Sequence, residues 1–139
     1  MSQVFADTGY WIALINPLDG LHDRAMSLSK TLGNSKIVTS EWVLTELLNS
    51  FATHGAFIRE KAIKTAITLR STKGVLVVPH SEATFEKAFD LFRQRLDKSW
   101  SLTDCASFLI MQQLGITEAL SYDRHFEQAN FKALLRTME

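Results

Sequence analysis

The chain has 139 residues, of which 46% are hydrophobic and 22% are charged, and these are ordinary values for one globular domain. They exclude a disordered or fibrous protein. The formal net charge of zero excludes a protein that coats nucleic acid through bulk positive charge, but it leaves room for an enzyme that holds one phosphate locally. No repeat or Pro/Gly/Ser-rich linker divides the sequence, so we expect a single domain over residues 1–139.

The sequence carries no signal for export or for a membrane. No apolar run approaches the roughly 18 to 20 residues that a membrane span requires, and no basic segment leads into an apolar one at the N-terminus. The single cysteine, Cys105, has no partner for an internal disulfide bond. We therefore expect a cytoplasmic protein with no membrane contact.

Short apolar runs alternate with longer segments of helical spacing along the chain. The expected elements, in order, are a strand over Val4–Ala6, a strand over Lys36–Thr39, a helix over Glu41–Ala52, a helix through Ile58–Ile67, a strand over Val75–Val78, a helix through Phe85–Leu96, a helix over Cys105–Leu114, a strand over Ala119–Tyr122 and a weak edge strand in Phe131–Leu135. Strands that alternate with helices pair in parallel through right-handed crossovers. The pattern predicts an α/β fold with a central parallel sheet and helices on both faces.

Two acids directly follow predicted strands. Asp7 comes after Val4–Ala6, and Asp123 comes after Ala119–Tyr122. Ligands of open parallel sheets bind beyond the carboxyl ends of the strands, where neighbouring crossovers diverge. Either acid alone is also explained as a turn former or a helix cap.

Asp104 lies at the start of a helix that is apolar nearly all round, which is typical of a buried helix. A carboxylate is favoured there by the helix dipole. The alternative is simple capping, in which Thr103 or Asp104 satisfies free backbone N–H groups.

The predicted helix Glu41–Ala52 offers two more acids. Glu46 and Glu41 border its apolar face on opposite sides, and periodicity does not choose between them. Glu41 has an easy structural role in the first turn of the helix, whereas Glu46 in mid-helix has none.

Carboxylates that face one another raise one another's pKa unless a cation neutralises them. Oxygen ligands without a Cys or His cluster favour Mg²⁺ or Mn²⁺ over zinc. A hard metal ion at a strand-end crevice is suited to phosphoryl chemistry.

Four segments resemble the signature motifs of PIN-domain nucleases, in the order and with the spacing of that family: Val4–Gly9, Thr45–Leu48, Ser101–Ala106 and Leu120–Phe126. The resemblance covers essentially the whole chain. In particular, the chain resembles the toxin ribonucleases of VapC-type toxin–antitoxin pairs.

The resemblance implies a PIN-like three-layer α/β/α fold and a metal-dependent endoribonuclease that hydrolyses RNA phosphodiester bonds with Mg²⁺ or Mn²⁺. Asp7, Asp104 and Asp123 match its metal-binding acids, and Glu46 matches the glutamate that completes the pocket. Thr8 and Ser121 match supporting hydroxyl positions, the second of which more often holds Thr. An RNA substrate, an antitoxin protein and a homodimer are implied in the same way.

Other residues carry weaker signals. Arg124 and His125 follow Asp123 and are candidates for RNA contacts, with a polar turn as the alternative. A run of bases between Phe57 and Lys73 is explained by a solvated helix face or by an RNA track. Cys105 is a poor nucleophile candidate because it lies in the predicted interior helix. The three tryptophans are candidates for base stacking, although core or interface positions are the more ordinary role of such large aromatics: Trp11, Trp42 and Trp100.

The sequence disfavours three alternative functions. A haloacid-dehalogenase-like phosphatase needs a second Asp where Gly9 stands, and a response-regulator receiver needs an acceptor Asp where the third strand instead runs into Pro79 and His80. The remaining alternative is a non-catalytic PIN-fold module that binds RNA or acts as a scaffold. The presence of all four acids argues against that alternative.

Overall fold

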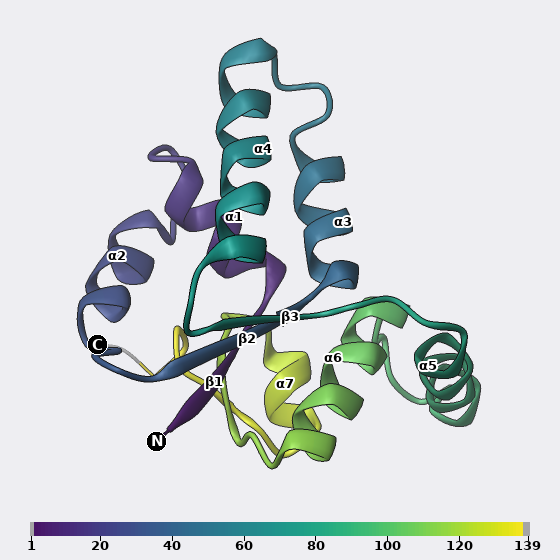
Figure 1. Ribbon diagram of the computed structural model, residues 1–139. Coiled ribbons are helices and arrows are strands. Elements are labelled where there is room, and N and C mark those ends of the chain that lie inside the picture. The colour runs from purple at the N-terminus through teal and green to yellow at the C-terminus, as the bar shows by residue number, and fades with distance from the viewer. Residues whose placement is uncertain (1, 138–139) are drawn as a thin grey trace.

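The computed structural model describes residues 2–137, and these form a five-stranded parallel sheet and seven helices (Figure 1). The strands are β1 (Gln3–Ala6), β2 (Lys36–Ser40), β3 (Val75–Val78), β4 (Glu118–Leu120) and β5 (Lys132–Ala133). The helices are α1 (Thr8–Ile15), α2 (His22–Lys30), α3 (Glu41–Ser50), α4 (Ala56–Ser71), α5 (Glu82–Gln94), α6 (Leu102–Leu114) and α7 (Arg124–Gln128). The predicted fold class is confirmed.

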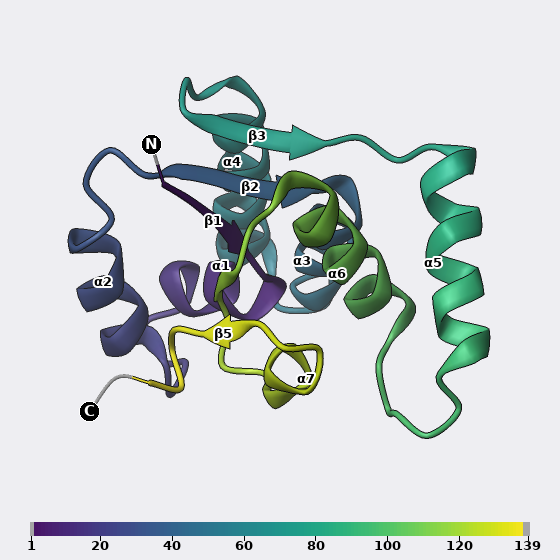
Figure 2. The ribbon, with the colours of Figure 1, turned by 90° about the horizontal axis from the view of Figure 1, so that it is seen from below.

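The direction of the crossovers assigns the helices to the two faces of the sheet. The strand order is β3-β2-β1-β4-β5, so the chain first moves outward from β1 to β3 and then returns to β4 beside β1. Right-handed crossovers in opposite directions lie on opposite faces. Helices α1 to α4 accordingly lie on one face, and α5 to α7 lie on the other (Figures 1 and 2).

The core lies on both faces of the central strands, as is usual for a parallel sheet. Phe5 and Val38 are completely buried, and so are Cys105 and Met111 on α6. The buried helix predicted from the sequence is therefore confirmed. Trp11, Trp42 and Trp100 are also buried, which removes them as candidates for stacking on bases.

Helices α1, α2 and α7 were not among the predicted elements, and the bounds of several predicted elements differ by a few residues. Strand β4 ends at Leu120 rather than at Tyr122, because the chain turns at Ser121, whose hydroxyl accepts a hydrogen bond from the Asp123 backbone N–H. On α5, the apolar stripe is not fully packed: Phe85, Phe89 and Phe92 are 44%, 45% and 44% exposed. The reason is that α5 packs against α6 and not on the sheet. In Figure 2, α6 lies between α5 and the sheet.

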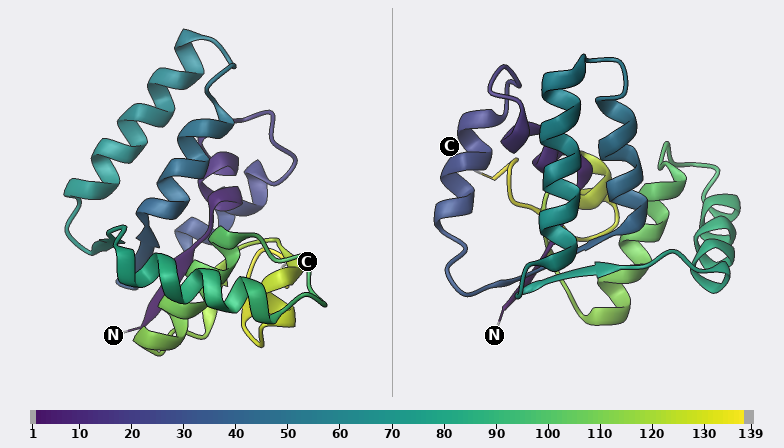
Figure 3. Two further views of the ribbon diagram at one scale, coloured as in Figure 1. Left: turned by 90° about the vertical axis from the view of Figure 1, so that its right-hand side faces the viewer. Right: turned by 45° about the horizontal axis from the view of Figure 1, so that its top comes forward.

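Helices α3 and α4 run side by side as a hairpin that extends away from the sheet (Figure 3). Ser40 is both the last residue of β2 and the N-cap of α3. As the cap, its hydroxyl accepts a hydrogen bond from the Val43 N–H at 3.2 Å. This cap sets the direction in which α3 leaves the sheet and brings it against α1.

Within residues 2–137, the structure contains no helix with the length and apolar character needed to cross a membrane.

Candidate active site

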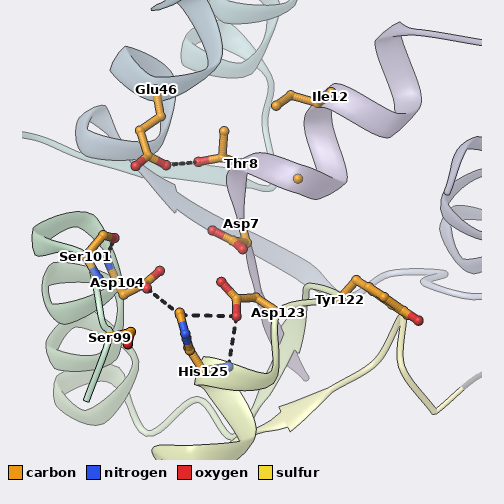
Figure 4. Close-up of a pocket in the computed structure, with 11 residues that line it drawn as sticks. Asp7, Thr8, Ile12, Glu46, Ser99, Ser101, Asp104, Tyr122, Asp123 and His125 are labelled. Carbon is orange, nitrogen blue, oxygen red and sulfur yellow. Dashed lines mark hydrogen bonds and ion pairs between the residues drawn. The ribbon is translucent and has the colours of Figure 1, made fainter. Parts of the chain in front are cut away.

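A cavity of about 510 Å³ opens at the carboxyl ends of β1 and β4. These neighbouring strands are the point where the crossovers diverge, which is the ligand-binding position of open parallel sheets. Figure 4 shows Asp7 in the middle of the cavity, with Glu46 and Thr8 on one side and Asp104, Asp123 and His125 on the other. The lining residues are Asp7, Thr8, Gly9, Ile12, Glu46, Ser99, Ser101, Asp104, Tyr122, Asp123 and His125.

Asp7 and Asp104 are the two buried acids that line the cavity. Asp7 lies between β1 and α1, its side chain is not used to cap α1, and it is only 9% exposed. The Ser121 hydroxyl donates a hydrogen bond to Asp7 Oδ2 at 2.9 Å. Burial raises the pKa of Asp7 to about 7, and the nearby charges of Asp104 and Asp123 act in the same direction, although the hydrogen bonds from Thr8 and Ser121 oppose the rise.

Asp104 both caps a helix and lines the cavity. Its backbone N–H donates to Ser101 Oγ at 2.9 Å, and its Oδ2 accepts from the Ser101 N–H at 3.0 Å, which together form a capping box at the start of α6. Asp104 therefore caps α6 together with Ser101, as the capping alternative predicted for Asp104, and it lines the cavity as well. Burial raises the pKa of Asp104, and the charge of Asp123 adds to the rise.

Asp123 and His125 are held together at the start of α7. Asp123 Oδ1 accepts a hydrogen bond from the His125 backbone N–H at 2.9 Å and caps this short helix. The His125 ring turns back into the cavity, where its Nδ1 lies 3.0 Å from Asp104 Oδ2 and 3.2 Å from Asp123 Oδ1. One ligand atom from each of these three residues lies within 4.8 Å of the other two.

The structure separates the two glutamates of α3. Glu46 lines the cavity, and its Oε1 accepts a hydrogen bond from the Thr8 hydroxyl at 2.7 Å. Glu41 is absent from the lining and instead accepts a hydrogen bond from the His80 backbone N–H at 2.6 Å. The choice that periodicity left open is therefore decided by the position of α3 beside α1.

Not every predicted contact residue reaches the cavity. Arg124 is exposed and lies outside the lining, whereas His125 is part of it. On α4, Lys61 and Lys64 border a different cavity, of about 340 Å³, together with Trp11.

Several lining residues were not among those predicted for the site, whereas Cys105 agrees with its prediction. Ser99, Ser101 and Tyr122 were not singled out, although the spacing of Ser101 before Asp104 is that of a capping box. Burial and the charge of Asp104 raise the pKa of Cys105 to about 11, so its thiol stays protonated and a nucleophilic role is disfavoured.

The fold and the cavity together define a parallel α/β domain with an acid-lined site that suits a divalent cation. The chain belongs to the PIN-domain family, whose family model matches residues 4–132.

One known protein is similar to this chain in sequence and structure, and a second shares its fold. The 23S rRNA-specific endonuclease VapC20 of Mycobacterium tuberculosis is 33% identical over 136 residues, which cover 93% of this chain and 95% of that protein. The crystal structure of the same protein, described as a toxin that cleaves the sarcin-ricin loop, superposes with a TM-score of 0.83 at 27% identity and covers 92% of this chain and 95% of its own. The FitAcB structure from Neisseria gonorrhoeae, at a TM-score of 0.64 and 14% identity over 94% of this chain and 95% of its own, shares the fold.

Proposed function

We propose that this protein is an endoribonuclease that hydrolyses RNA phosphodiester bonds in the acid-lined cavity, with Asp7, Asp104 and Asp123 holding Mg²⁺ or Mn²⁺ and Glu46 completing the pocket. One observation carries the proposal. Carboxylates from four segments far apart in sequence, at β1, α3, α6 and the start of α7, converge on one cavity at the end of the sheet.

The donor set fits a hard divalent cation. Carboxylate oxygens are the ligands that Mg²⁺ and Mn²⁺ prefer. The raised pKa of Asp7 shows that burial opposes its ionisation, and a bound cation would offset that cost directly. When bound, such an ion supplies positive charge beside the phosphate and activates water for attack on phosphorus.

The remaining lining residues position these acids. Ser121 holds Asp7 and the Asp123 backbone through one hydroxyl, and Ser101 holds Asp104 through the capping box. Thr8 directs the Glu46 carboxylate by donating to its Oε1. The carboxylates are thus oriented before any ligand arrives, which is the arrangement that makes catalytic groups effective.

The similarity to a 23S rRNA-specific endonuclease supports a structured loop of ribosomal RNA as the substrate. We place the activity in the cytoplasm, because ribosomes are found there. An antitoxin protein as the inhibitory partner is supported by the same toxin relative, and a homodimer is part of the proposal.

The test is RNA cleavage by purified protein with Mn²⁺, with Mg²⁺ and with EDTA, on intact ribosomes and on a labelled hairpin. Asp7→Asn and Asp104→Asn should each lower the cleavage rate by roughly 100-fold or more, because each removes a charge that holds the ion. Glu60→Gln, at an exposed position on α4, is the matched control and should cleave like the parent. Unchanged cleavage by the Asn variants would refute the site, and metal-independent RNA binding without turnover would identify the non-catalytic module instead.

A further inference from the structure

We infer that His125 is itself a ligand of the divalent ion, beside Asp104 and Asp123, and that its imidazole shifts the preference of the site from Mg²⁺ towards Mn²⁺. This inference rests on the proposed function of the cavity and adds a nitrogen donor to its ligand set.

The distances in the cluster match those between neighbouring ligands of one ion. Ligands in adjacent octahedral positions around a small divalent ion lie about 3 Å apart, given metal–ligand distances of about 2.1 Å. His125 Nδ1 lies 3.0 Å from Asp104 Oδ2 and 3.2 Å from Asp123 Oδ1. In residues 2–137 these are the one group of three or more His, Cys, Asp or Glu side chains whose ligand atoms all lie within 4.8 Å of one another, and Asp7 faces this group in the same cavity (Figure 4).

The backbone around His125 holds its ring beside Asp104 and Asp123. Asp123 caps α7 by accepting a hydrogen bond from the His125 backbone N–H. Phe126, which follows His125, is completely buried and anchors that helix. On the other side, the capping box of α6 fixes Asp104. The His125 side chain is 24% exposed, so most of the ring is enclosed by the cavity wall.

The chemical type of the donor atom determines which ion the site binds more tightly. Mg²⁺ takes oxygen ligands and keeps several of its waters, whereas imidazole nitrogen is a good ligand for transition ions. A site of carboxylates with one imidazole therefore binds Mn²⁺ better, relative to Mg²⁺, than a site of carboxylates alone.

The competing role for His125 is a contact to an RNA phosphate. A phosphate contact leaves ion binding unchanged when His125 is replaced and weakens RNA binding instead. Ion binding without RNA therefore separates the two roles.

The experiment is pulsed electron paramagnetic resonance of Mn²⁺ bound to the full chain, prepared with natural and with ¹⁵N-labelled histidine. The parent should show a hyperfine coupling to a histidine nitrogen that changes with the label. His125 is the one histidine among the lining residues of the cavity, so His125→Asn should abolish this coupling, and His54→Asn should keep it.

Calorimetric titration of the same proteins gives the affinities. His125→Asn should weaken Mn²⁺ binding by about 10-fold or more and Mg²⁺ binding by less. His125→Asp, which offers oxygen in place of nitrogen, should recover binding with the preference moved towards Mg²⁺.

A parent that binds Mn²⁺ and cleaves RNA without any nitrogen coupling would overturn the ligand role of His125 and leave the proposed function intact. A nitrogen coupling that persists in His125→Asn would overturn it as well. A parent that binds neither ion would overturn both proposals. The parent's own spectrum suffices for the first outcome, so the test does not depend on how well the variants fold.

Discussion

Asp7→Asn should stabilise the ion-free protein at neutral and alkaline pH, although it removes a proposed metal ligand. Burial raises the pKa of Asp7 from 3.8 to about 7, so the folded chain keeps a proton that the unfolded chain has lost. The stability from this proton is fully present below about pH 4 and is lost as the pH rises through 7. At pH 8 the ionised carboxylate therefore costs roughly 4 kcal/mol, which the uncharged Asn side chain avoids.

The magnitude is measured by urea unfolding in EDTA at pH 5 and at pH 8. Between these two pH values the advantage of Asp7→Asn over the parent should grow by roughly 2–3 kcal/mol. Asn keeps an oxygen that accepts the Ser121 hydrogen bond, so the comparison isolates the charge. Glu60→Gln, at an exposed acid, should show no such growth.

Mn²⁺ should reverse the order of stability. A cation that binds Asp7 stabilises the folded parent and does little for Asp7→Asn. Two results in EDTA would show that burial does not hold a proton on Asp7. One is an Asp7→Asn variant no more stable than the parent at pH 8, and the other is a stability advantage of the variant that is the same at pH 5 and pH 8.

Three further predictions test single residues that support the cavity or the fold. Ser121→Ala removes a hydroxyl that donates a hydrogen bond to Asp7 and accepts one from the Asp123 backbone N–H. Urea unfolding should therefore show a loss of stability of about 1–3 kcal/mol, which Ser121→Thr should largely avoid. Glu46→Gln should lower the initial rate of RNA cleavage by about 10-fold or more. Glu41→Gln should not lower that rate, and equal rates for the two variants would contradict the assignment of Glu46 to the site. Gly115→Ala should cost about 1 kcal/mol in thermal unfolding, because Gly115 ends α6 with a φ of 69°; no cost would mean that this turn relaxes freely.

The architecture was predictable because the central strands of a parallel sheet are buried on both faces. Such strands appear in the sequence as short, continuous apolar runs, and Val75–Val78 was predicted with the bounds that the structure has. The end of β4 was not, because a single hydrogen bond from the Asp123 backbone N–H to the Ser121 hydroxyl turns the chain there. Local polar contacts of this kind leave no periodic signal.

The acids of the cavity were predictable from their places at element ends, but their partners were not. Glu46 and Glu41 border one helix face equally well, and only the approach of α1, which brings the Thr8 hydroxyl to Glu46, distinguishes them. The same holds for His125. Its contact with Asp104 joins α7 to α6 across 21 residues, and no spacing rule within one element predicts such a contact.

The zero net charge of the chain excludes attraction of RNA by bulk positive charge, and the cavity explains how a nucleic-acid enzyme is compatible with it. RNA is held at such a site by a local field rather than by the charge of the whole protein. Without a cation, the ionised acids around the cavity repel a phosphate, and only His125 among the lining residues offers a basic group. A divalent ion reverses the sign of that local field. The affinity of the cavity for a phosphodiester is therefore expected to depend on the ion, and to do so more steeply than a binding surface of lysines and arginines would.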